Sequence, residues 1–241
     1  MNFLEELNSL PISQLSPAGF QRLNWQIYHA ANDIFYSKQT MASVMQDHGA
    51  QVAKRARKWK LQDIPYHDAM TFSRAVGLAN MLHMDIGSEL WRRFPGVCPY
   101  CGHAPCLGPL CKNGTARRKR KIVPSVSRPH TLHGFQEMFA RIYPYNLRTL
   151  KVAAPHLLEE TVEVNTALRD LGSRNDPKDL EEARLELTDV ITTTFAVANA
   201  MRFSLAQEME KWFSRGCPGC HKSPCTCGYA IMKNGELVRK K

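Results

Sequence analysis

Features that would place this chain in a membrane or outside the cell are missing from its sequence. Its 241 residues contain no run of about 18 consecutive apolar residues, which a membrane-spanning helix requires. The first residues, MNFLEELNSLPIS, include acidic side chains and lack the basic start and apolar centre of a secretory signal. The sequence therefore predicts a cytoplasmic protein that makes no contact with a membrane.

Cysteine is absent from most of the chain, because all eight cysteines fall into two clusters of four. Disulfide frameworks are typical of small secreted proteins, and nothing in this sequence indicates export. Four thiolates at short spacing, with Gly and Pro between them, are instead typical of closed tetrahedral zinc sites. Two structural Zn²⁺ sites are therefore predicted, one formed by Cys98, Cys101, Cys106 and Cys111 and the other by Cys217, Cys220, Cys225 and Cys227.

The cysteine clusters also leave alternatives open. Cys98-Pro-Tyr-Cys101 matches the redox motif of glutaredoxins, but that chemistry places the motif at a helix start after a strand, and here a predicted helix precedes it. Zinc ribbons can also bind nucleic acid. The close spacing of Cys227 leaves the fourth ligand of the second cluster open, and His103 and His221 are candidate substitutes within the two clusters.

Negative charge is scarce relative to positive charge. The chain has 32 Lys and Arg residues against 22 Asp and Glu residues, which gives a formal net charge of +10 and a pI near 9.3. Six positive charges lie within 112–121, at Lys112 and in the run 117–121. This segment is either a solvated basic linker or a contact for nucleic acid or polyphosphate.

The chain contains an internal repeat. The sequence Gly-Phe-Gln at 19–21 recurs at 134–136, an offset of 115 residues. The sequence Cys-Pro-x-Cys at 98–101 recurs at 217–220, an offset of 119 residues. Ordered matches of this kind indicate a tandem duplication, with a short insertion in the second copy near 173–177.

Strand-like alternation of apolar residues is also absent, so each copy is predicted to be a helical bundle. In the second copy, the apolar pattern and its breaks predict helices over 131–149, 155–171, 178–201 and 204–214. The predicted fold is all-α, with a cysteine cluster at the end of each bundle. The expected organisation is a first repeat at 1–111, a basic linker at 112–129, a second repeat at 130–230 and a basic tail at 231–241.

Two acidic pairs lie in otherwise apolar helices of the second copy. Glu160 and Glu163 are three residues apart, and residues at this spacing share one helix face. Glu186 and Asp189 repeat the pattern in the next helix. An antiparallel hairpin would bring the four carboxylates together, and these cannot be buried without a cation. The pattern therefore predicts a site for a divalent metal ion; the alternative is a solvated acidic face.

The acidic residues resemble the signature of a known family. The motif Glu159-Glu160-x-x-Glu163 followed by Glu186-x-x-Asp189 is similar to that of the MazG-like nucleotide pyrophosphohydrolases, in the all-α NTP pyrophosphatase superfamily. The resemblance implies cleavage of a nucleoside triphosphate between its α- and β-phosphates, which releases a monophosphate and pyrophosphate. It also implies that Mg²⁺ is held by Glu160, Glu163, Glu186 and Asp189, with Glu159 alongside.

The resemblance covers about 130–215, and the chain departs from the family in two respects. Cysteine clusters are not part of the family's usual core, and the first copy lacks the acidic residues. Because family members typically dimerise, the first copy is expected to be a degenerate internal partner in a pseudo-dimer with one metal site. Whether a larger homo-oligomer forms is left open. At the positions of the five acids, the first copy has Val44, Met45, His48, His67 and Met70.

Two further expectations concern ligands. Asn199, about ten residues beyond Asp189, is predicted either to contact the nucleotide or to have a capping or core-polar role. A second function also stays open, that of a non-catalytic zinc-stabilised module that binds nucleotide or nucleic acid through 112–121. No base-reading motif is recognisable, so the sequence predicts neither the base nor the sugar of a substrate.

Overall fold

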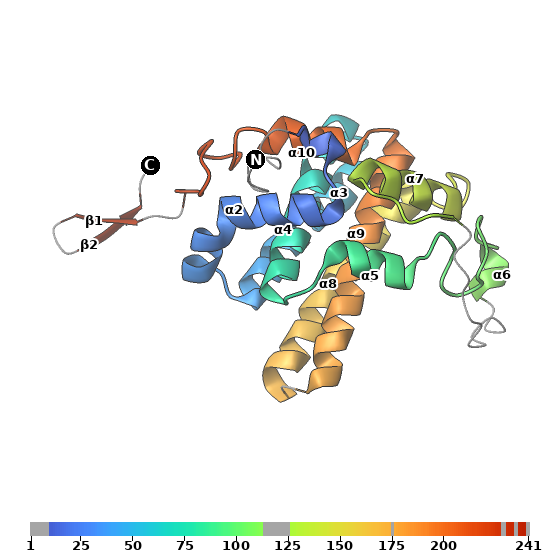
Figure 1. The fold of residues 1–241 in the computed structure, drawn as a ribbon, viewed down its shortest axis with the longest axis horizontal. Coiled ribbons are helices and arrows are strands. Elements are labelled where there is room, and N and C mark those ends of the chain that lie inside the picture. The colour runs from blue at the N-terminus through green and yellow to red at the C-terminus, as the bar shows by residue number, and fades with distance from the viewer. Residues whose placement is uncertain (1–9, 113–125, 175, 228–229, 234–235, 240–241) are drawn as a thin grey trace.

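The computed structural model describes residues 10–112, 126–174, 176–227, 230–233 and 236–239, most of which are helical (Figure 1). The first half contains η1 (Ile12–Gln14), α2 (Pro17–Phe35), α3 (Lys38–Arg57), η2 (Leu61–Asp63), α4 (Ile64–Met81) and α5 (Ile86–Arg93). The short helix α6 (Pro109–Lys112) contains Cys111, the last residue of the first cysteine cluster. The second half contains α7 (Leu132–Ile142), α8 (Leu150–Arg174), α9 (Pro177–Met201) and α10 (Leu205–Phe213).

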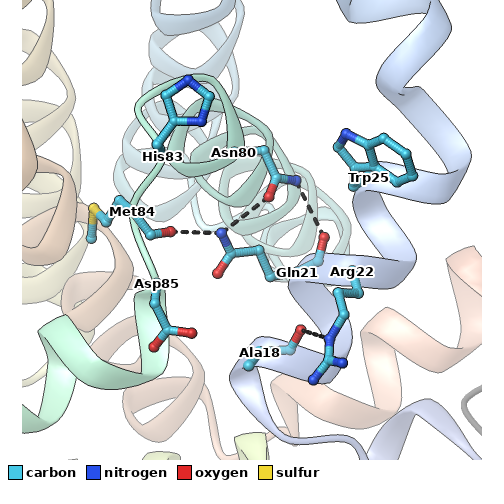
Figure 2. A pocket seen from close by; sticks show the side chains of 8 residues that line it. All are labelled: Ala18, Gln21, Arg22, Trp25, Asn80, His83, Met84 and Asp85. Atoms are coloured by element: carbon cyan, nitrogen blue, oxygen red, sulfur yellow. Dashed lines mark hydrogen bonds between the residues drawn. The ribbon is translucent and has the colours of Figure 1, made fainter. Parts of the chain in front are cut away.

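Helices α2 to α5 recur in the same order as α7 to α10, and one hydrogen-bond pattern marks both series. In the first half, Gln21 Nε2 donates to Asn80 Oδ1 (3.0 Å), beside a cavity of about 480 Å³ (Figure 2). The Asn80 amide donates back to the Gln21 carbonyl at 3.2 Å. In the second half, Gln136 and Asn199 make the same pair of bonds, at 3.0 and 3.1 Å. The duplicated sequence therefore produces a duplicated clamp between the first and third helices of each half.

The helix that opens each half begins in the same way. Ser16 Oγ accepts a hydrogen bond from the backbone N–H of Gly19 at 2.9 Å, and Thr131 Oγ1 accepts one from Gly134 at 3.0 Å. Such caps satisfy backbone donors that the first helical turn leaves without partners. The repeated Gly-Phe-Gln sequence is thus the first turn of α2 and of α7.

The centre of the molecule is formed by two helical hairpins, α3–α4 and α8–α9, with α3 against α8 and α4 against α9. Gly49 allows α3 and α8 to approach closely, since a Cβ atom there would lie 3.2 Å from the Thr161 methyl group. Asn165 on α8 donates to Gln46 on α3 at 2.7 Å. The largest side chains that are fully buried include Phe20, Phe72, Phe135, Phe139, Phe195 and Phe213.

Each cysteine cluster follows the last helix of its own half but contacts the first helix of the other half. The backbone N–H of Cys106 donates to the Ile142 carbonyl on α7 at 2.7 Å. The backbone N–H of Cys225 donates to the Ile27 carbonyl on α2 at 2.6 Å. In addition, the Tyr143 hydroxyl donates to Cys98 Sγ at 3.5 Å. The clusters therefore link the two halves reciprocally.

Two helix boundaries in the second half differ from the sequence prediction. Helix α7 ends at Ile142 rather than at 149, because Pro144 disfavours helical backbone at Tyr143. Helix α8 begins at Leu150 rather than at 155, so that Pro155 lies inside it. The intervening loop, 143–149, lies next to the candidate active site described below.

The expectation that strands are absent is wrong for the C-terminal segment. Strands β1 (Ala230–Lys233) and β2 (Glu236–Arg239) pair antiparallel, with Ile231 opposite Val238. The predicted basic tail at 231–241 therefore includes most of a β-hairpin, which lies away from the helical body in Figure 1. Within the described residues, no helix combines the length and the apolar character that crossing a membrane would demand.

Candidate active site

Three of the predicted acidic residues meet between α8 and α9. Carboxylate oxygens of Glu160, Glu163 and Glu186 all lie within 4.8 Å of one another. Glu160 is only 6% exposed, and its Oε2 atom is buried with no hydrogen-bond partner among the described residues. An unpartnered buried carboxylate oxygen is costly, and a divalent cation would satisfy it. The arrangement therefore fits a cation with oxygen ligands, of which Mg²⁺ is the common case.

The other oxygen of Glu160 is oriented by a short relay. His156 Nε2 lies 2.8 Å from Glu160 Oε1, and Arg148 Nη1 lies 3.0 Å from His156 Nδ1. Because arginine can only donate, Nδ1 must accept and Nε2 must carry the proton that is donated to Glu160. His156 was not among the predicted site residues, although its position four residues before Glu160 places it on the same helix face.

Crowding and burial make the carboxylates resist ionisation. Burial, together with the charges of Glu163, Asp189 and Glu160, raises the pKa of Glu186 to about 8. The pKa of Glu163 is also raised, first by burial and then by Glu160. A site of this kind at neutral pH requires either protons or a metal ion.

The remaining two predicted acids lie outside the group of three. The Asp189 carboxylate is bonded to the guanidinium of Arg93, which comes from α5 in the first half. Burial nevertheless raises the pKa of Asp189 to about 6. Glu159 is exposed, because it precedes Glu160 and so projects about 100° around the helix from it. No sequence pattern indicated Arg93, since it reaches the site only through the packing of α5 against α9.

Asn199 lies at the contact between α7 and α9, where its amide exchanges the hydrogen bonds with Gln136 described above. Its equivalent in the first half, Asn80, makes the same bonds although the first half lacks the equivalents of Glu160, Glu163, Glu186 and Asp189. The sequence left two roles open for Asn199, a nucleotide contact and a capping or core-polar role. These hydrogen bonds agree with the core-polar role.

A cavity of about 800 Å³ opens beside the carboxylates. Glu160 and Asp189 line it at one side, and the first cysteine cluster and the α7–α8 loop line it elsewhere. Arg148 of that loop also lines the cavity. A ligand that binds a metal ion at the carboxylates would thus extend into an enclosed space.

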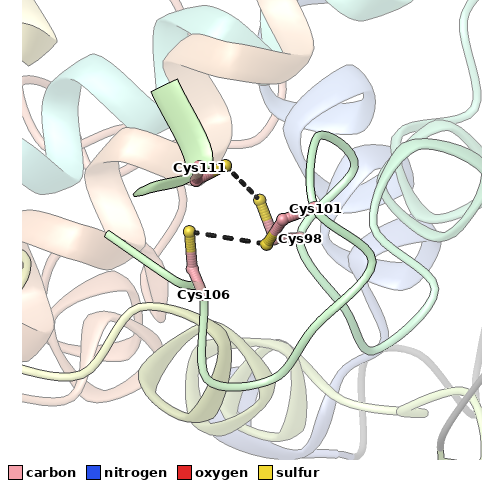
Figure 3. Close-up of side chains that lie close together, drawn as sticks. All are labelled: Cys98, Cys101, Cys106 and Cys111. Atoms are coloured by element: carbon pink, nitrogen blue, oxygen red, sulfur yellow. Dashed lines mark hydrogen bonds between the residues drawn. The ribbon is translucent and has the colours of Figure 1, made fainter. Parts of the chain in front are cut away.

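The sulfur atoms of each cysteine cluster converge, as Figure 3 shows for the first. In each cluster all four sulfur atoms lie within 4.8 Å of one another. Zinc bound tetrahedrally, with Zn–S distances of about 2.3 Å, places its sulfur ligands about 3.8 Å apart. The measured Sγ–Sγ distances are 3.7 Å for Cys98–Cys111, 3.9 Å for Cys101–Cys106, 3.6 Å for Cys217–Cys227 and 3.9 Å for Cys220–Cys225. Both clusters could therefore bind zinc, with Cys227 as a member of the second.

One thiol in each cluster has strong thiolate character. Burial works against ionisation of Cys101, but hydrogen bonds from the Leu107 and His103 backbones outweigh it and lower its pKa to about 6. Cys220, at the equivalent position, has its pKa lowered to about 6 in the same way, with Thr226 among its donors. The thiolate is the form that binds metals.

The basic run at 117–121 lies outside the described residues, so its expected contact with nucleic acid or polyphosphate stays a prediction. Comparison with known proteins gives no matching family model, no matching curated protein and no matching solved structure.

Proposed function

We propose that this protein is a Mg²⁺-dependent nucleotide pyrophosphohydrolase of the MazG-like type, in which the two halves act as an internal pseudo-dimer with one active site. The observation that carries the proposal is the meeting of three carboxylates from α8 and α9, one of which has a buried oxygen without a partner. A solvated acidic face would not bury Glu160 at 6% exposure.

In this proposal, Glu160, Glu163 and Glu186 hold Mg²⁺, and Asp189 completes the set. Bound Mg²⁺ would neutralise charge on the phosphates and orient the α–β anhydride. The relay through His156 keeps Glu160 in one orientation. Hydrolysis then adds water across the bond between the α-phosphorus and the bridging oxygen, which gives a nucleoside monophosphate and pyrophosphate.

Two arginines supply positive charge for the substrate phosphates. Arg93 lies against Asp189, which lines the cavity, and Arg148 lines the cavity itself. Guanidinium groups bind phosphate oxygens well, and phosphoryl chemistry depends mainly on positioning and charge stabilisation. Because Arg93 belongs to the first half, the proposal gives that half a direct role although it lacks the acids.

The cysteine clusters have a structural role in this proposal. Each would hold one Zn²⁺ and so fasten its own half to the first helix of the other. Structural zinc contributes directly to folding free energy, so the two ions would stabilise the pseudo-dimer.

Release of pyrophosphate from a panel of ribo- and deoxyribonucleoside triphosphates with Mg²⁺ tests the proposal. The informative variants are Glu163→Gln and Asp189→Asn. Asp170→Asn is the control, because Asp170 lies near the C-terminal end of α8 and its side chain is 43% exposed. We expect the first two to lose about 100-fold or more in rate, the order seen when one preorganised electrostatic group is removed, and the control to retain activity. Equal rates in all four proteins, or no release by the wild type, would refute the enzyme and leave the non-catalytic binding module.

A further inference from the structure

The first cysteine cluster contributes an aromatic residue to the lining of the cavity, and the second cluster has a glycine at the equivalent position. Tyr100 lies between Cys98 and Cys101, lines the cavity and is 55% exposed. The equivalent position in the second cluster is Gly219. A Cβ atom on Gly219 would lie 3.0 Å from Cys227 Sγ, so a side chain there would press on a metal ligand. The two clusters therefore have similarly arranged sulfur atoms, but only the first has an aromatic side chain that can contact a ligand in the cavity.

Tyr100 and the acidic residues of the candidate active site line the same cavity. Glu160 and Asp189 line it together with Tyr100 and three cysteines of the first cluster, Cys98, Cys106 and Cys111. A ligand in this cavity would therefore contact both Tyr100 and the carboxylates.

The cavity is lined by both charged and apolar residues. Glu160, Asp189 and Arg148 supply charge. Phe94, Tyr143, Leu147 and Val152 contribute apolar surface to the same cavity, and Val152 is 47% exposed. Apolar side chains with a few charged groups among them are a common mark of a ligand site. The lining therefore suits a ligand with both a charged part and an apolar part.

We propose that the space between the first cysteine cluster and the carboxylates binds the base of the nucleotide, with the Tyr100 ring as its stacking surface. This inference rests on the proposed function and adds the position of the base and a positioning residue. It also separates the roles of the two clusters, because the first shapes the ligand site and the second does not.

Equilibrium binding of a nucleoside triphosphate analogue with a non-hydrolysable α–β linkage, in the presence of Mg²⁺, tests this inference without catalysis. Inorganic pyrophosphate is the second probe, since it reaches the carboxylates but has no base. The variants are Tyr100→Ala and Tyr100→Phe. Tyr145→Ala is the control, because Tyr145 is 57% exposed in the α7–α8 loop but does not line the cavity.

Tyr100→Ala is expected to weaken binding of the analogue about 10-fold, the order of one base–aromatic stack, and to leave pyrophosphate binding unchanged. Tyr100→Phe and Tyr145→Ala should bind the analogue as the wild type does. In the activity assay, Tyr100→Ala should raise KM with little change in kcat.

Unchanged analogue binding by Tyr100→Ala would overturn the inference, as would equal losses for the analogue and pyrophosphate. A loss in Tyr100→Phe as large as that in Tyr100→Ala would show a hydroxyl contact and overturn the stacking role. These results are separable from failure of the proposed function. In that case the wild type releases pyrophosphate from no nucleotide, whereas the inference about Tyr100 is decided by the binding of the analogue alone.

Discussion

Two regions that occupy equivalent positions in the two halves differ in the charge of their side chains. Both lie where the second and third helices of a half face each other, α8 with α9 in one and α3 with α4 in the other. The first is crowded with carboxylates, and the second has none at the same positions. By the offsets of the repeat, Glu160, Glu163, Glu186 and Asp189 correspond to Met45, His48, His67 and Met70.

The region in the first half is filled by neutral rings. His48 Nδ1 lies 3.2 Å from His67 Nδ1, and burial lowers the pKa of His48 to about 4. Tyr66 packs edge-on against Trp212 with ring centroids 4.8 Å apart. Trp212 stands at the position equivalent to Arg93. His48 and His67 therefore pair as neutral rings in this region, whereas the acidic region needs either protons or a metal ion at neutral pH. The same arrangement of helices therefore accommodates either paired neutral rings or clustered carboxylates.

The largest effect should follow from giving the second half the residues of the first. Glu163→His with Glu186→His removes two of the three converging carboxylates and should lower pyrophosphate release about 100-fold or more. The helical fold should persist, and Mg²⁺ should no longer raise the Tm, because the ion loses its site. Release assays and thermal melts with and without Mg²⁺ measure both effects.

His48→Gln is the matched control for that exchange, since it changes the equivalent of Glu163. It should retain the activity and the Mg²⁺ response of the wild type. If His48→Gln were as inactive as the double variant, the two regions would not differ in function.

The next largest effect concerns the cysteine clusters. Cys101→Ser and Cys220→Ser are equivalent changes, and each should lower the zinc content from about two ions per chain to about one. Each should also lower the Tm by about 10 °C or more, because structural zinc contributes to folding free energy. Only Cys101→Ser should also weaken binding of the nucleotide analogue, since only the first cluster lines the cavity. Equal weakening by both variants would contradict the separation of roles.

A third comparison uses a buried acid that only the first half contains. Asp68 is fully buried, and neither of its carboxylate oxygens has a hydrogen-bond partner among the described residues. Its equivalent in the second half is Leu187, also fully buried. Burial raises the pKa of Asp68 well above its usual value of 3.8. Folding therefore favours the protonated acid, so the stability is complete below about pH 4 and falls as the pH rises above it.

Asp68→Leu should remove that loss and raise the free energy of unfolding at pH 7 by about 2 kcal/mol, the order of the cost of an unsatisfied buried polar group. Urea unfolding between pH 4 and pH 8 measures the difference. Asp63→Asn is a suitable control, because Asp63 lies near the same helix start and is partly exposed. A wild-type stability that does not fall over this range would contradict the burial of an unpaired acid.

The sequence was informative where neighbours along the chain determine the chemistry. The spacing of Glu160 and Glu163 predicted a shared helix face, and the cysteine spacing predicted two groups whose sulfur atoms converge. Pro144 also indicates where α7 ends, because the residue before a proline disfavours helical backbone. These features depend on backbone geometry over a few residues, which local patterns record.

The features that escaped prediction depend on packing between distant segments. Arg93 reaches Asp189 across 96 residues, and Cys106 docks on Ile142 of the other half. Neither contact leaves a periodic signal in the sequence. The β-hairpin at the C-terminal end was missed because its strands are four residues each, too short for a clear alternation.

The smallest expected effect tests a feature that the two halves share. Asn80→Ala and Asn199→Ala each remove one clamp between the first and third helices and leave the glutamine amide short of a partner. Each should lower the free energy of unfolding by about 1 kcal/mol, the net contribution of a hydrogen bond, and the two losses should be similar because the hydrogen bonds are the same. Asn199→Ala should retain the wild-type KM for nucleotide. A KM that rises in Asn199→Ala but not in Asn80→Ala would show that Asn199 contacts the nucleotide. The two asparagines would then differ in function although their hydrogen bonds to glutamine are the same.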